Sequence, residues 1–419
     1  MPKKILLLST SDLNGGAAIA CYRLFLALLS QPELEVRLLV QYQQRPHPQV
    51  KAIATSFWQK QLAQARFVAE RLDFWRLARN KEVRFAFSTA STGTDLHTHP
   101  WVQEADVLHL HWINFGFLSL SSIQKLAALG KPLVWTLQDM WAFTGGCHYT
   151  GACRGFERQC GNCPFLKKPH PNDLSHRVWK RKKTLFETGK WAITPTSQWL
   201  AGEARRSALL SSCRIEAIPA PIDTQLFCPE ASTLARQALG LPAHSFLLLF
   251  GSAKISDPRK GIAYLREALH YLRTQKESLP ALELLVFGQD KAQSLSDWPF
   301  PVHYLGQLAP ASVIKAYQAA NAFVMPSLED NLPNTILESL SCGTPVIAFR
   351  TGGIPEMIHH QVNGYLAPPQ NAADLAQGIQ WLYHFSPGEQ LRQAARAKIE
   401  THFSPEIVGT RYLAFYKSL

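Results

Sequence analysis

Two sets of short apolar runs, each alternating with helix-like stretches, constrain the fold of this chain more than any other feature. The first run, "KILLLST", has the length and continuous apolar character of a parallel strand that is covered on both faces. It is followed by Gly15 and Gly16 and then by the helical pattern "AAIACYRLFLALL". The remaining strand candidates of the first set are "VRLLV" (36–40), "DVLHLH" (106–111), "PLVWTL" (132–137) and "WAITP" (191–195).

The second set of apolar runs predicts a second sheet. Its members are "FLLLFGS" (246–252), "LELLVFG" (282–288), "VHYLG" (302–306), "AFVMPS" (322–327) and "PVIAF" (345–349). Because strands that alternate with helices form parallel, doubly wound sheets, we predict an α/β chain with two Rossmann-like domains. Such domains bind ligands at the carboxyl ends of their strands, so we expect the site in a cleft between the domains.

A Pro-rich stretch between the two sets, "IPAPIDTQLFCPE" (218–230), suits a hinge. We therefore predict an N-terminal domain over 1–220 and a C-terminal domain over 221–402. The last segment, 403–419, has a Ser-Pro-Glu start and reads as one amphipathic helix. This helix could pack back on the N-terminal domain.

Length and charge limit the kinds of protein and partner that need to be considered. A chain of 419 residues is too long for one average domain, and no stretch offers the roughly 18 uninterrupted apolar residues of a membrane span. The apolar run at the N-terminus is too short for a signal peptide. The net charge of +12 favours a polyanion, an anionic membrane face or a phosphorylated substrate. No nucleic-acid-binding signature occurs, so we expect no nucleic acid partner.

The stretch "SLEDNLPNTILESLSCGTPVIAFRTGG" (327–353) carries the chemistry. Pro333 suits the first turn of a helix because its missing N–H costs nothing there, and Gly343 suits the left-handed end of that helix. On this interpretation Asp330 lies in the loop before the helix and Glu338 lies in its second turn.

The start of this helix is a candidate sugar-nucleotide site. The amide groups of Asn334 and Thr335, with the positive end of the helix dipole, favour a phosphate group. Glu338 is placed to bind both hydroxyls of a ribose, and Asp330 to reach a sugar on the same diphosphate. The alternative is a capped helix with solvated acidic residues.

This stretch resembles the acid-x7-acid motif of the large retaining, GT-B-fold glycosyltransferase family, in its bacterial exopolysaccharide and cell-surface polysaccharide branch. Six further segments resemble that family in the same order along nearly the whole chain. They are the Gly15-Gly16 loop, "DVLHLHW", "IPAPIDTQLF", "DPRKG", "GGIPEMI" and "NGYLAPP".

The resemblance implies the transfer of a sugar from a nucleoside diphosphate to an acceptor with retained anomeric configuration. It implies that Lys260 and Arg259 neutralise the leaving diphosphate, whose negative charge grows in the transition state. The alternative for this pair is a solvated loop. No Asp-x-Asp sequence occurs, so we expect no metal cofactor to be needed for catalysis.

The resemblance also assigns roles at the strand ends. It implies that His111 is a hydrogen-bonding positioner of the donor sugar, although a lone histidine at a strand end is more often structural. His109, two residues earlier, we interpret as structural. Gly15, Gly16 and Ser252 are predicted to contact the donor.

The chain departs from the family pattern at several positions. The first acid is Asp330 where the family usually has Glu, and Ser252 follows a strand-end glycine where many members carry Arg. Lys254 or Arg259 would have to replace that charge. Ala220 and Gln138 stand where the family has Asn and, in this branch, His. These departures bear on the identity of the donor.

The resemblance thus predicts a retaining glycosyltransferase that acts on a glycan, lipid-linked or other acceptor in polysaccharide biosynthesis. The alternatives are a sugar-nucleotide epimerase of the same fold and a non-catalytic carbohydrate-binding protein. We expect the protein in the cytoplasm, where sugar nucleotides are made, with the inner face of the membrane as an alternative location.

Four of the eight cysteines cluster within 17 residues, in "CHYTGACRGFERQCGNCP". Cys147, Cys153, Cys160 and Cys163 include a Cys-x-x-Cys pair, which is typical of a closed tetrahedral zinc site. We predict a structural zinc ion. The alternative is a set of reduced thiols or a redox pair.

A basic, aromatic segment, residues 57–81, has apolar residues at helical spacing with lysine and arginine interleaved. Its apolar residues are Trp58, Leu62, Ala65, Leu72 and Trp75, and its basic residues include Lys60, Arg66, Arg71, Arg76 and Arg79. Such a helix could lie on anionic lipid. The alternative is a surface helix packed on its own domain.

Overall fold

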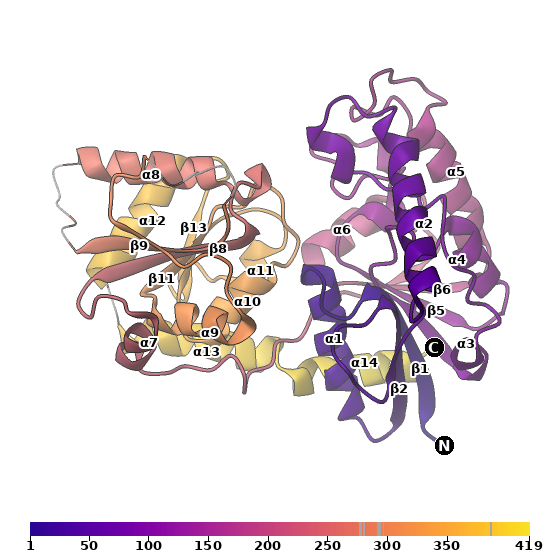
Figure 1. The fold of residues 1–419 in the computed structure, drawn as a ribbon, viewed down its shortest axis with the longest axis horizontal. Coiled ribbons are helices and arrows are strands. Elements are labelled where there is room, and N and C mark those ends of the chain that lie inside the picture. The colour runs from indigo at the N-terminus through magenta and orange to yellow at the C-terminus, as the bar shows by residue number, and fades with distance from the viewer. Residues whose placement is uncertain (276–278, 280, 291–294, 296, 386–387) are drawn as a thin grey trace. The chain divides into compact units, whose positions relative to one another are not determined.

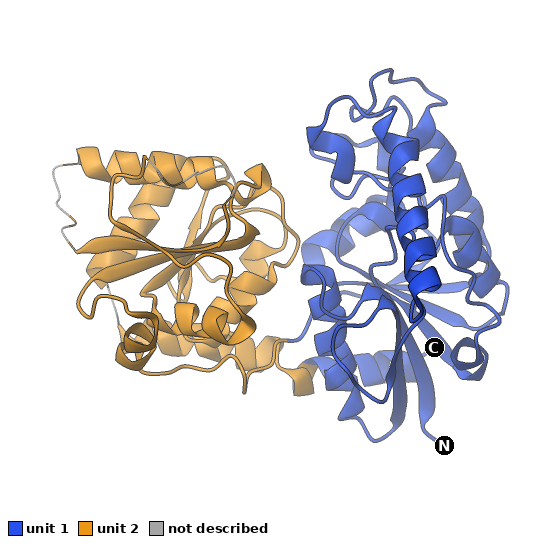
Figure 2. Cartoon of the chain, in the orientation of Figure 1, with its two compact units in different colours: residues 1–221, 408–419 blue, residues 222–407 orange. Residues whose placement is uncertain are grey.

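The chain divides into two compact units. The computed structural model describes residues 1–275, 279, 281–290, 295, 297–385 and 388–419 (Figure 1). Unit 1 comprises residues 1–221 and 408–419, and unit 2 comprises residues 222–407 (Figure 2). The first boundary falls in the Pro-rich stretch, and the second falls inside the last helix, α14 (Pro405–Lys417).

Unit 1 is built on a seven-stranded sheet in which every strand pair is parallel, in the order β3-β2-β1-β4-β5-β6-β7. Its strands are β1 (Lys3–Ser11), β2 (Leu34–Tyr42), β3 (Val50–Ala52), β4 (Val107–Leu110), β5 (Pro132–Leu137), β6 (Lys190–Pro195) and β7 (Arg214–Ile215). Its helices are α1 (Gly16–Leu29), α2 (Phe57–Trp75), α3 (Pro100–Glu104), α4 (Leu120–Ala127), α5 (Leu174–Glu187), α6 (Gln198–Arg206) and the end of α14. Short 3-10 helices are η1 (Glu82–Phe85), η2 (Trp141–Phe143) and η3 (Gly155–Glu157).

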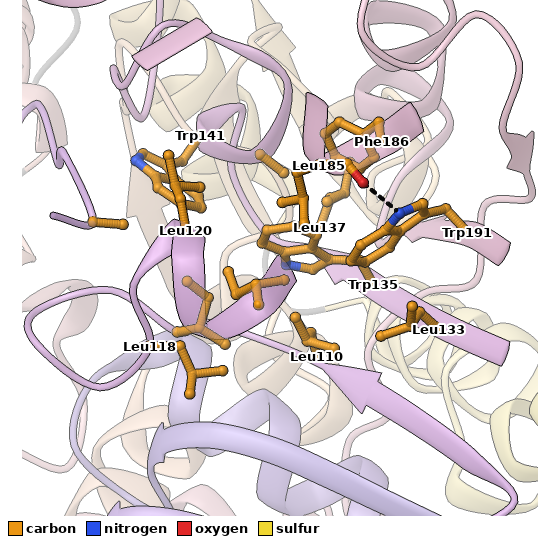
Figure 3. Packing of buried hydrophobic residues seen from close by; sticks show 14 of the residues in the cluster. Leu110, Leu118, Leu120, Leu133, Trp135, Leu137, Trp141, Leu185, Phe186 and Trp191 are labelled. Atoms are coloured by element: carbon orange, nitrogen blue, oxygen red, sulfur yellow. Dashed lines mark hydrogen bonds between the residues drawn. The ribbon is translucent and has the colours of Figure 1, made fainter. Parts of the chain in front are cut away.

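Both faces of this sheet are buried. Because successive residues of a strand point to opposite faces, Leu6 and Leu8 of β1 join one apolar cluster while Ile5 and Leu7 join another. The first cluster is completed by α3 to α6 and is rich in tryptophan. Figure 3 shows its centre, where the indole N–H of Trp191 donates a 3.1 Å hydrogen bond to the carbonyl of Leu185. The second cluster is completed by α1 and by the aromatic face of α14.

Unit 2 is built on a six-stranded parallel sheet in the order β10-β9-β8-β11-β12-β13. Its strands are β8 (Phe246–Lys254), β9 (Leu282–Gln289), β10 (Val302–Tyr304), β11 (Ala322–Met325), β12 (Val346–Phe349) and β13 (Gly364–Ala367). Its helices are α7 (Ser232–Leu239), η4 (Pro258–Lys260), α8 (Ile262–Thr274), α9 (Pro310–Ala319), α10 (Asn334–Ser341), α11 (Ile354–Met357), α12 (Ala372–Phe385) and α13 (Glu389–His402).

The helices of unit 2 cover both faces of its sheet as well. Helices α8 and α12 lie on one side of the sheet, and α9 and α13 lie on the other (Figure 1). Side chains of α8 and α12 pack in one apolar cluster, and side chains of α9, α10 and α13 pack in the other. All ten predicted strands are confirmed. The sequence did not predict β3, β7 and β13, which have only two to four residues each, and β8 extends two residues beyond the predicted run.

The strand orders place one switch point in each sheet, between β1 and β4 in unit 1 and between β8 and β11 in unit 2. At these points the connections leave toward opposite sides of the sheet, and ligands of open α/β sheets bind at the carboxyl ends of such strands.

Candidate functional site

The loop after β8 presents two cationic side chains at the switch point of unit 2. The carboxylate of Asp257 accepts hydrogen bonds from the Arg259 amide at 3.0 Å and from its guanidinium at 2.7 Å. Burial raises the pKa of Asp257, but the hydrogen bonds and charge of Arg259 outweigh it, so the pKa lies below its usual value. Gly261 follows with φ of 72°, and a Cβ there would lie 1.8 Å from the carbonyl oxygen of Pro326. The loop therefore packs directly against the residues that follow β11.

Lys260 and Asp330 form an ion pair at this edge of the sheet. The Lys260 Nζ lies 2.6 Å from the Asp330 Oδ2, and the two side chains are 24% and 15% exposed. Ser327 donates to the same oxygen at 3.4 Å. The ammonium group is thus held in a fixed place yet stays accessible, as an electrostatic site for a phosphate group requires.

The acidic loop is fixed by the two glycines after β12. Gly352 has φ of 56°, and a Cβ there would lie 1.8 Å from the carbonyl oxygen of Asp330. The Gly353 amide donates to the carbonyl of Asn331 at 2.9 Å. This close approach explains the glycine at position 352 of the 327–353 stretch, because any side chain there would displace Asp330.

Helix α10 begins at Asn334, with Pro333 as its N-cap, so Asp330 lies before the helix and Glu338 lies in its second turn, as predicted. Glu338 is 8% exposed, and its Oε2 accepts a 3.2 Å hydrogen bond from the hydroxyl of Tyr317. Within the described residues, the buried hydroxyl of Thr335 at the helix start has no hydrogen-bond partner. The helix start therefore offers both donors and a positioned carboxylate.

Two neighbours complete this edge. Ser252 is 4% exposed in β8, and its hydroxyl is likewise unpartnered among the residues that the structure describes. Burial raises the pKa of Glu329, beside Asp330, and the charge of Arg259 opposes that rise. Of the predicted site residues, the structure brings Lys260, Asp330 and the start of α10 together.

In unit 1, the Gly15-Gly16 loop follows β1 at the other switch point. Gly15 has φ of 94°, and a Cβ there would meet no atom within 4 Å, so open space adjoins it. Helix α1 begins at Gly16. The loop is exposed and its backbone is accessible, as a contact with a ligand would require.

His111 follows β4 and is 2% exposed, and in the described part of the chain neither of its ring nitrogens has a hydrogen-bond partner. Burial lowers its pKa to about 3, so the imidazole is neutral near pH 7. His109 instead bonds the hydroxyls of Tyr416 at 2.6 Å and Thr136 at 2.7 Å, which confirms its structural role.

His111 lines a small pocket at the carboxyl ends of β4 and β5. Other lining residues include Trp112, Asn114, Gln138 and Asp139. The buried Oδ1 of Asn114 is also unpartnered within the described residues. Two unsatisfied polar side chains facing one pocket indicate a place where a polar group of a ligand is bound, because buried polar groups are normally paired.

Asp139 is a pocket residue that the sequence reasoning missed. Its carboxylate accepts from the Nδ1 of His148 at 2.7 Å, the indole of Trp112 at 3.3 Å and the amide of Trp141 at 2.8 Å. Burial raises the pKa of Asp139, but His148 and the hydrogen bonds outweigh it, so the pKa lies below its usual value. Asp139 is therefore an oriented anion at the pocket wall.

A buried chain of polar groups sets the orientation of His148. Arg71 donates to the hydroxyl of Ser88 at 2.9 Å, and that hydroxyl lies 3.0 Å from the His148 Nε2. The Ser88 hydroxyl and the Asp139 carboxylate thus hold the two ring nitrogens of His148. Glu70 pairs with Arg71 at 2.8 Å, and both side chains are fully buried. Adjacent charged residues on a helix are normally predicted to be solvent-exposed, so the sequence did not reveal this chain of contacts.

The four clustered cysteines are free thiols that line a second pocket of unit 1. Among the described residues, no group of three or more His, Cys, Asp or Glu side chains is arranged to hold a metal ion. The predicted zinc site therefore stays a prediction.

Comparison with known proteins identifies the relatives of this chain. Residues 245–384, nearly all within unit 2, match the family described as "Glycosyl transferases group 1". The chain is 24% identical over 275 residues to the putative colanic acid biosynthesis glycosyl transferase WcaC of Escherichia coli, a match that covers 60% of this chain and 62% of WcaC. Over residues 245–384 the chain is thus similar to the group 1 glycosyltransferases. The aligned part spans less than two thirds of WcaC, and about half of several other curated relatives.

Solved structures of other proteins share the fold over nearly the whole chain. HepE of Anabaena in complex with UDP has a TM-score of 0.65 at 16% identity, covering 99% of this chain and all of that one. Sucrose-phosphate synthase of Thermosynechococcus elongatus has a TM-score of 0.66 at 20% identity, covering 99% of this chain and 98% of that one. The predicted GT-B fold is confirmed.

The match to the group 1 glycosyltransferases includes the whole unit 2 site. Ser252, Arg259, Lys260, Asp330 and Glu338 all lie inside residues 245–384. His111, Gly15 and Gly16 lie outside them, so their roles rest on unit 1 alone. The relatives give no support to the epimerase alternative.

Proposed function

We propose that this protein is a retaining glycosyltransferase that moves a sugar from a nucleoside-diphosphate donor to a carbohydrate or lipid-linked acceptor in polysaccharide biosynthesis. The observation that carries the proposal is the Lys260–Asp330 pair beside the start of α10, with Glu338 one turn further along. This set lies at the switch point of a sheet whose residues match the group 1 glycosyltransferases.

Each group of this set has a part in handling the donor. Glu338, held by Tyr317, accepts hydrogen bonds from the ribose hydroxyls, and Asp330 binds the donor sugar. Lys260, with Arg259 beside it, carries the positive charge that stabilises the departing diphosphate. The start of α10 adds the amide groups of Asn334 and Thr335 and the positive end of its dipole. The UDP and UDP-glucose bound to HepE support a nucleotide sugar as donor.

Unit 1 supplies the remaining contacts in this proposal. The neutral imidazole of His111 donates or accepts a hydrogen bond to a substrate hydroxyl, and Asp139 accepts one. The exposed Gly15-Gly16 loop lets substrate approach the backbone. The assignment of WcaC to colanic acid biosynthesis supports a polysaccharide as the product class.

The test of this function is a panel of sugar nucleotides incubated with the purified protein. A glycosyltransferase transfers its sugar slowly to water, so one donor should release its nucleoside diphosphate. Proton NMR at early times should show the released sugar in the anomeric configuration of the donor. Release of the inverted anomer would refute the retaining mechanism, and intact donors throughout would refute the activity.

We also propose that α2 brings the protein to the inner face of an anionic membrane, in the cytoplasm where sugar nucleotides are made. Helix α2 packs on unit 1 through Ala63, Glu70, Arg71 and Phe74. The apolar residues predicted at helical spacing lie outside that buried set and, apart from the half-buried Trp75, are exposed. The large apolar side chains exposed along α2 are Phe57 (65%), Trp58 (79%), Leu62 (51%), Val68 (42%) and Leu72 (41%).

The charge around this exposed stripe suits anionic lipid. Lys60 and Arg76 are exposed on the same helix, and the chain carries a net charge of +12. An apolar stripe flanked by basic residues binds a membrane surface by burying its apolar face at the headgroup level. In the described part of the chain, no helix is long and apolar enough to cross a membrane.

Vesicle flotation tests the membrane proposal. The protein should float with vesicles that contain phosphatidylglycerol and much less with neutral phosphatidylcholine vesicles. The double variant Trp58→Ser/Leu62→Ser should lose flotation. Leu234→Ser is the control, because Leu234 is 56% exposed on α7 of unit 2. Equal flotation of both variants would overturn the proposal.

A further inference from the structure

The segment between β5 and α5 has little regular structure, yet it brings four thiols to one pocket. Its regular elements are the short 3-10 helices η2 and η3. Cys147, Cys153, Cys160 and Cys163 line the pocket together with aromatic side chains such as Phe87 and Phe156. Three of the four thiols are buried. A cross-link at this place would hold together a segment that contains no strand and no α-helix.

Two of the four sulfur atoms accept hydrogen bonds from backbone amides. The Gly145 N–H donates to the Cys160 Sγ at 3.0 Å, and the Gly155 N–H donates to the Cys153 Sγ at 3.5 Å. Donors directed at sulfur favour the thiolate over the thiol, and such donors orient and stabilise metal-bound thiolates. The two amides therefore orient their sulfur atoms, while burial raises the pKa of the Cys147, Cys160 and Cys163 thiols.

The backbone of the Cys-x-x-Cys pair makes a tight turn. Asn162 has φ of 49°, and Gly161 has φ of 157° with its α-carbon so close to Pro171 that a Cβ would lie 2.4 Å from the Pro171 carbonyl oxygen. The Asn162 amide bonds the carbonyl of His170 at 2.9 Å, and the Cys163 amide bonds the carboxylate of Asp173 at 2.8 Å. This turn holds both thiols of the pair toward the shared pocket.

Lys182 provides an independent observation. Its side chain is fully buried, and its ammonium group donates to the carbonyls of Thr144 and Trp141 and lies 3.6 Å from the centre of the Trp141 ring. Among the described residues no carboxylate forms an ion pair with it, and the thiols of Cys147 and Cys160 are within its electrostatic reach. Burial lowers the pKa of Lys182 to about 7, the charge of Asp139 opposes that fall, and a negative centre in the thiol pocket would oppose it further.

We propose that the four cysteines bind one Zn²⁺ ion as thiolates. Binding forms four Zn–S bonds of about 2.3 Å, releases one proton from each thiol and changes no oxidation state. The resulting centre carries two negative charges, which Lys182 partly neutralises. As the described thiols now stand they do not enclose an ion, so binding includes rotation of their side chains toward the pocket centre.

The centre would also fix a residue of the neighbouring pocket. His148 directly follows Cys147, and its ring holds the carboxylate of Asp139 at 2.7 Å. Phe87 and Cys147 form an isolated antiparallel bridge that ties the same segment to the residue before Ser88. Loss of the ion would therefore release the chain of polar groups from Arg71 to Asp139.

Elemental analysis of the full-length protein, purified without added metal, tests the proposal. We expect one zinc per chain, retained in Cys213→Ser and lost in Cys160→Ser. Cys213 is the control because it is a half-buried thiol of unit 1 outside the pocket. Zinc that persists at full occupancy in Cys160→Ser would overturn the four-thiolate assignment.

Two measurements on the unmodified protein keep the test decisive if Cys160→Ser does not fold. Exchange with Co²⁺ should produce the thiolate-to-cobalt charge-transfer band of a tetrahedral sulfur site. Removal of the ion by a chelator should make four further thiols reactive. A metal-free protein with four freely reactive thiols, or with two disulfides found by mass spectrometry, would overturn the proposal.

Discussion

A single ammonium–carboxylate contact, Lys260 to Asp330, joins two loops that lie 70 residues apart in the sequence. Neither residue is fully buried, so the pair contributes little to stability. The pair matters because it positions the ammonium group, so that a diphosphate bound at this edge of the sheet contacts a group already held in place. The pair therefore belongs to the chemistry of the site.

Replacement of Lys260 by Ala should reduce turnover at saturating donor by about 100-fold, because it removes one electrostatic stabiliser of the departing diphosphate. Lys315→Ala is a matched control, since Lys315, on α9, forms a similar half-exposed ion pair with Glu230. Its turnover should stay near that of the unmodified protein. Near-normal turnover of Lys260→Ala in the donor hydrolysis assay would contradict the assignment.

His111 predicts a pH dependence of the stability of unit 1. The folded imidazole has a pKa of about 3, and the unfolded one has the ordinary value of about 6.5. Between these two pKa values the imidazole is protonated in the unfolded chain and neutral in the folded chain. The free energy of unfolding therefore falls as the pH falls. From pH 7 to pH 5 this single residue should cost about 2 kcal/mol of the free energy of unfolding.

Urea unfolding at both pH values checks this, with tryptophan fluorescence as the signal. All of the 11 tryptophans except Trp298 and Trp381 lie in unit 1. The pH-dependent loss should be smaller in His111→Asn than in the unmodified protein, and unchanged in the exposed-histidine control His244→Asn. The same loss in all three proteins would show that His111 is not the group responsible.

At the scale of elements, the loop between β8 and α8 depends on close contact with the end of β11. Gly261→Ala places a methyl group 1.8 Å from the Pro326 carbonyl oxygen, in addition to the cost of a positive φ. Gly240, at the end of α7, has a similar φ of 65° but open space around its missing side chain. The two substitutions thus share the conformational cost and differ only in the steric one.

Gly240→Ala should lower the free energy of unfolding by about 1 kcal/mol, the usual cost of alanine at positive φ. Gly261→Ala should lower the free energy of unfolding several-fold more than Gly240→Ala. It should also weaken nucleotide binding, because the loop between β8 and α8 has to shift away from Pro326. Thermal denaturation and nucleotide titration of both variants check this. Equal losses would mean that the contact with Pro326 does not constrain the loop.

The elements that the sequence predicted well are those with strong local patterns. Continuous apolar runs marked ten strands because a parallel strand covered on both faces needs apolar residues throughout. Strand β7, with two residues, has no pattern to find. The sequence did not predict which face of α2 is buried: that face contains Glu70 and Arg71, while the apolar stripe faces solvent.

The candidate site was likewise predictable only where local sequence signals mark it. The positions of Asp330 and Glu338 around a helix start follow from Pro333 and Gly343, which are local signals. The contact of His148 with Asp139 depends on tertiary structure that no spacing encodes. These two side chains meet because the segment that follows β5 folds back on itself, and the spacing of its residues does not reveal this.

At the scale of the whole molecule, the chain returns to unit 1 after completing unit 2. Tyr412, Phe415 and Tyr416 of α14 are at most 1% exposed and pack with Phe25 in the apolar cluster of unit 1. Tyr416 also bonds the ring of His109. The last twelve residues are thus part of the unit 1 core.

A chain truncated after residue 407 should therefore lose the fold of unit 1. Removing three buried aromatic side chains costs more than about 5 kcal/mol, which is comparable with the whole stability of a domain. Unit 2 keeps its own sheet and clusters and should still bind nucleotide. Removal of residues 418–419 alone is the control and should be tolerated. Native tryptophan fluorescence in the longer truncation would contradict this account of α14.

The central claim, that unit 2 binds a nucleoside diphosphate through Glu338 and Lys260, is tested most directly by calorimetric titration with UDP and other nucleoside diphosphates. At least one should bind the unmodified protein and the control Glu267→Gln, whose substitution lies on the exposed face of α8. Glu338→Gln should raise the dissociation constant at least about 10-fold, the equivalent of a lost hydrogen bond to a charged group. Equal affinity in Glu338→Gln, or no binding of any nucleoside diphosphate, would contradict the claim.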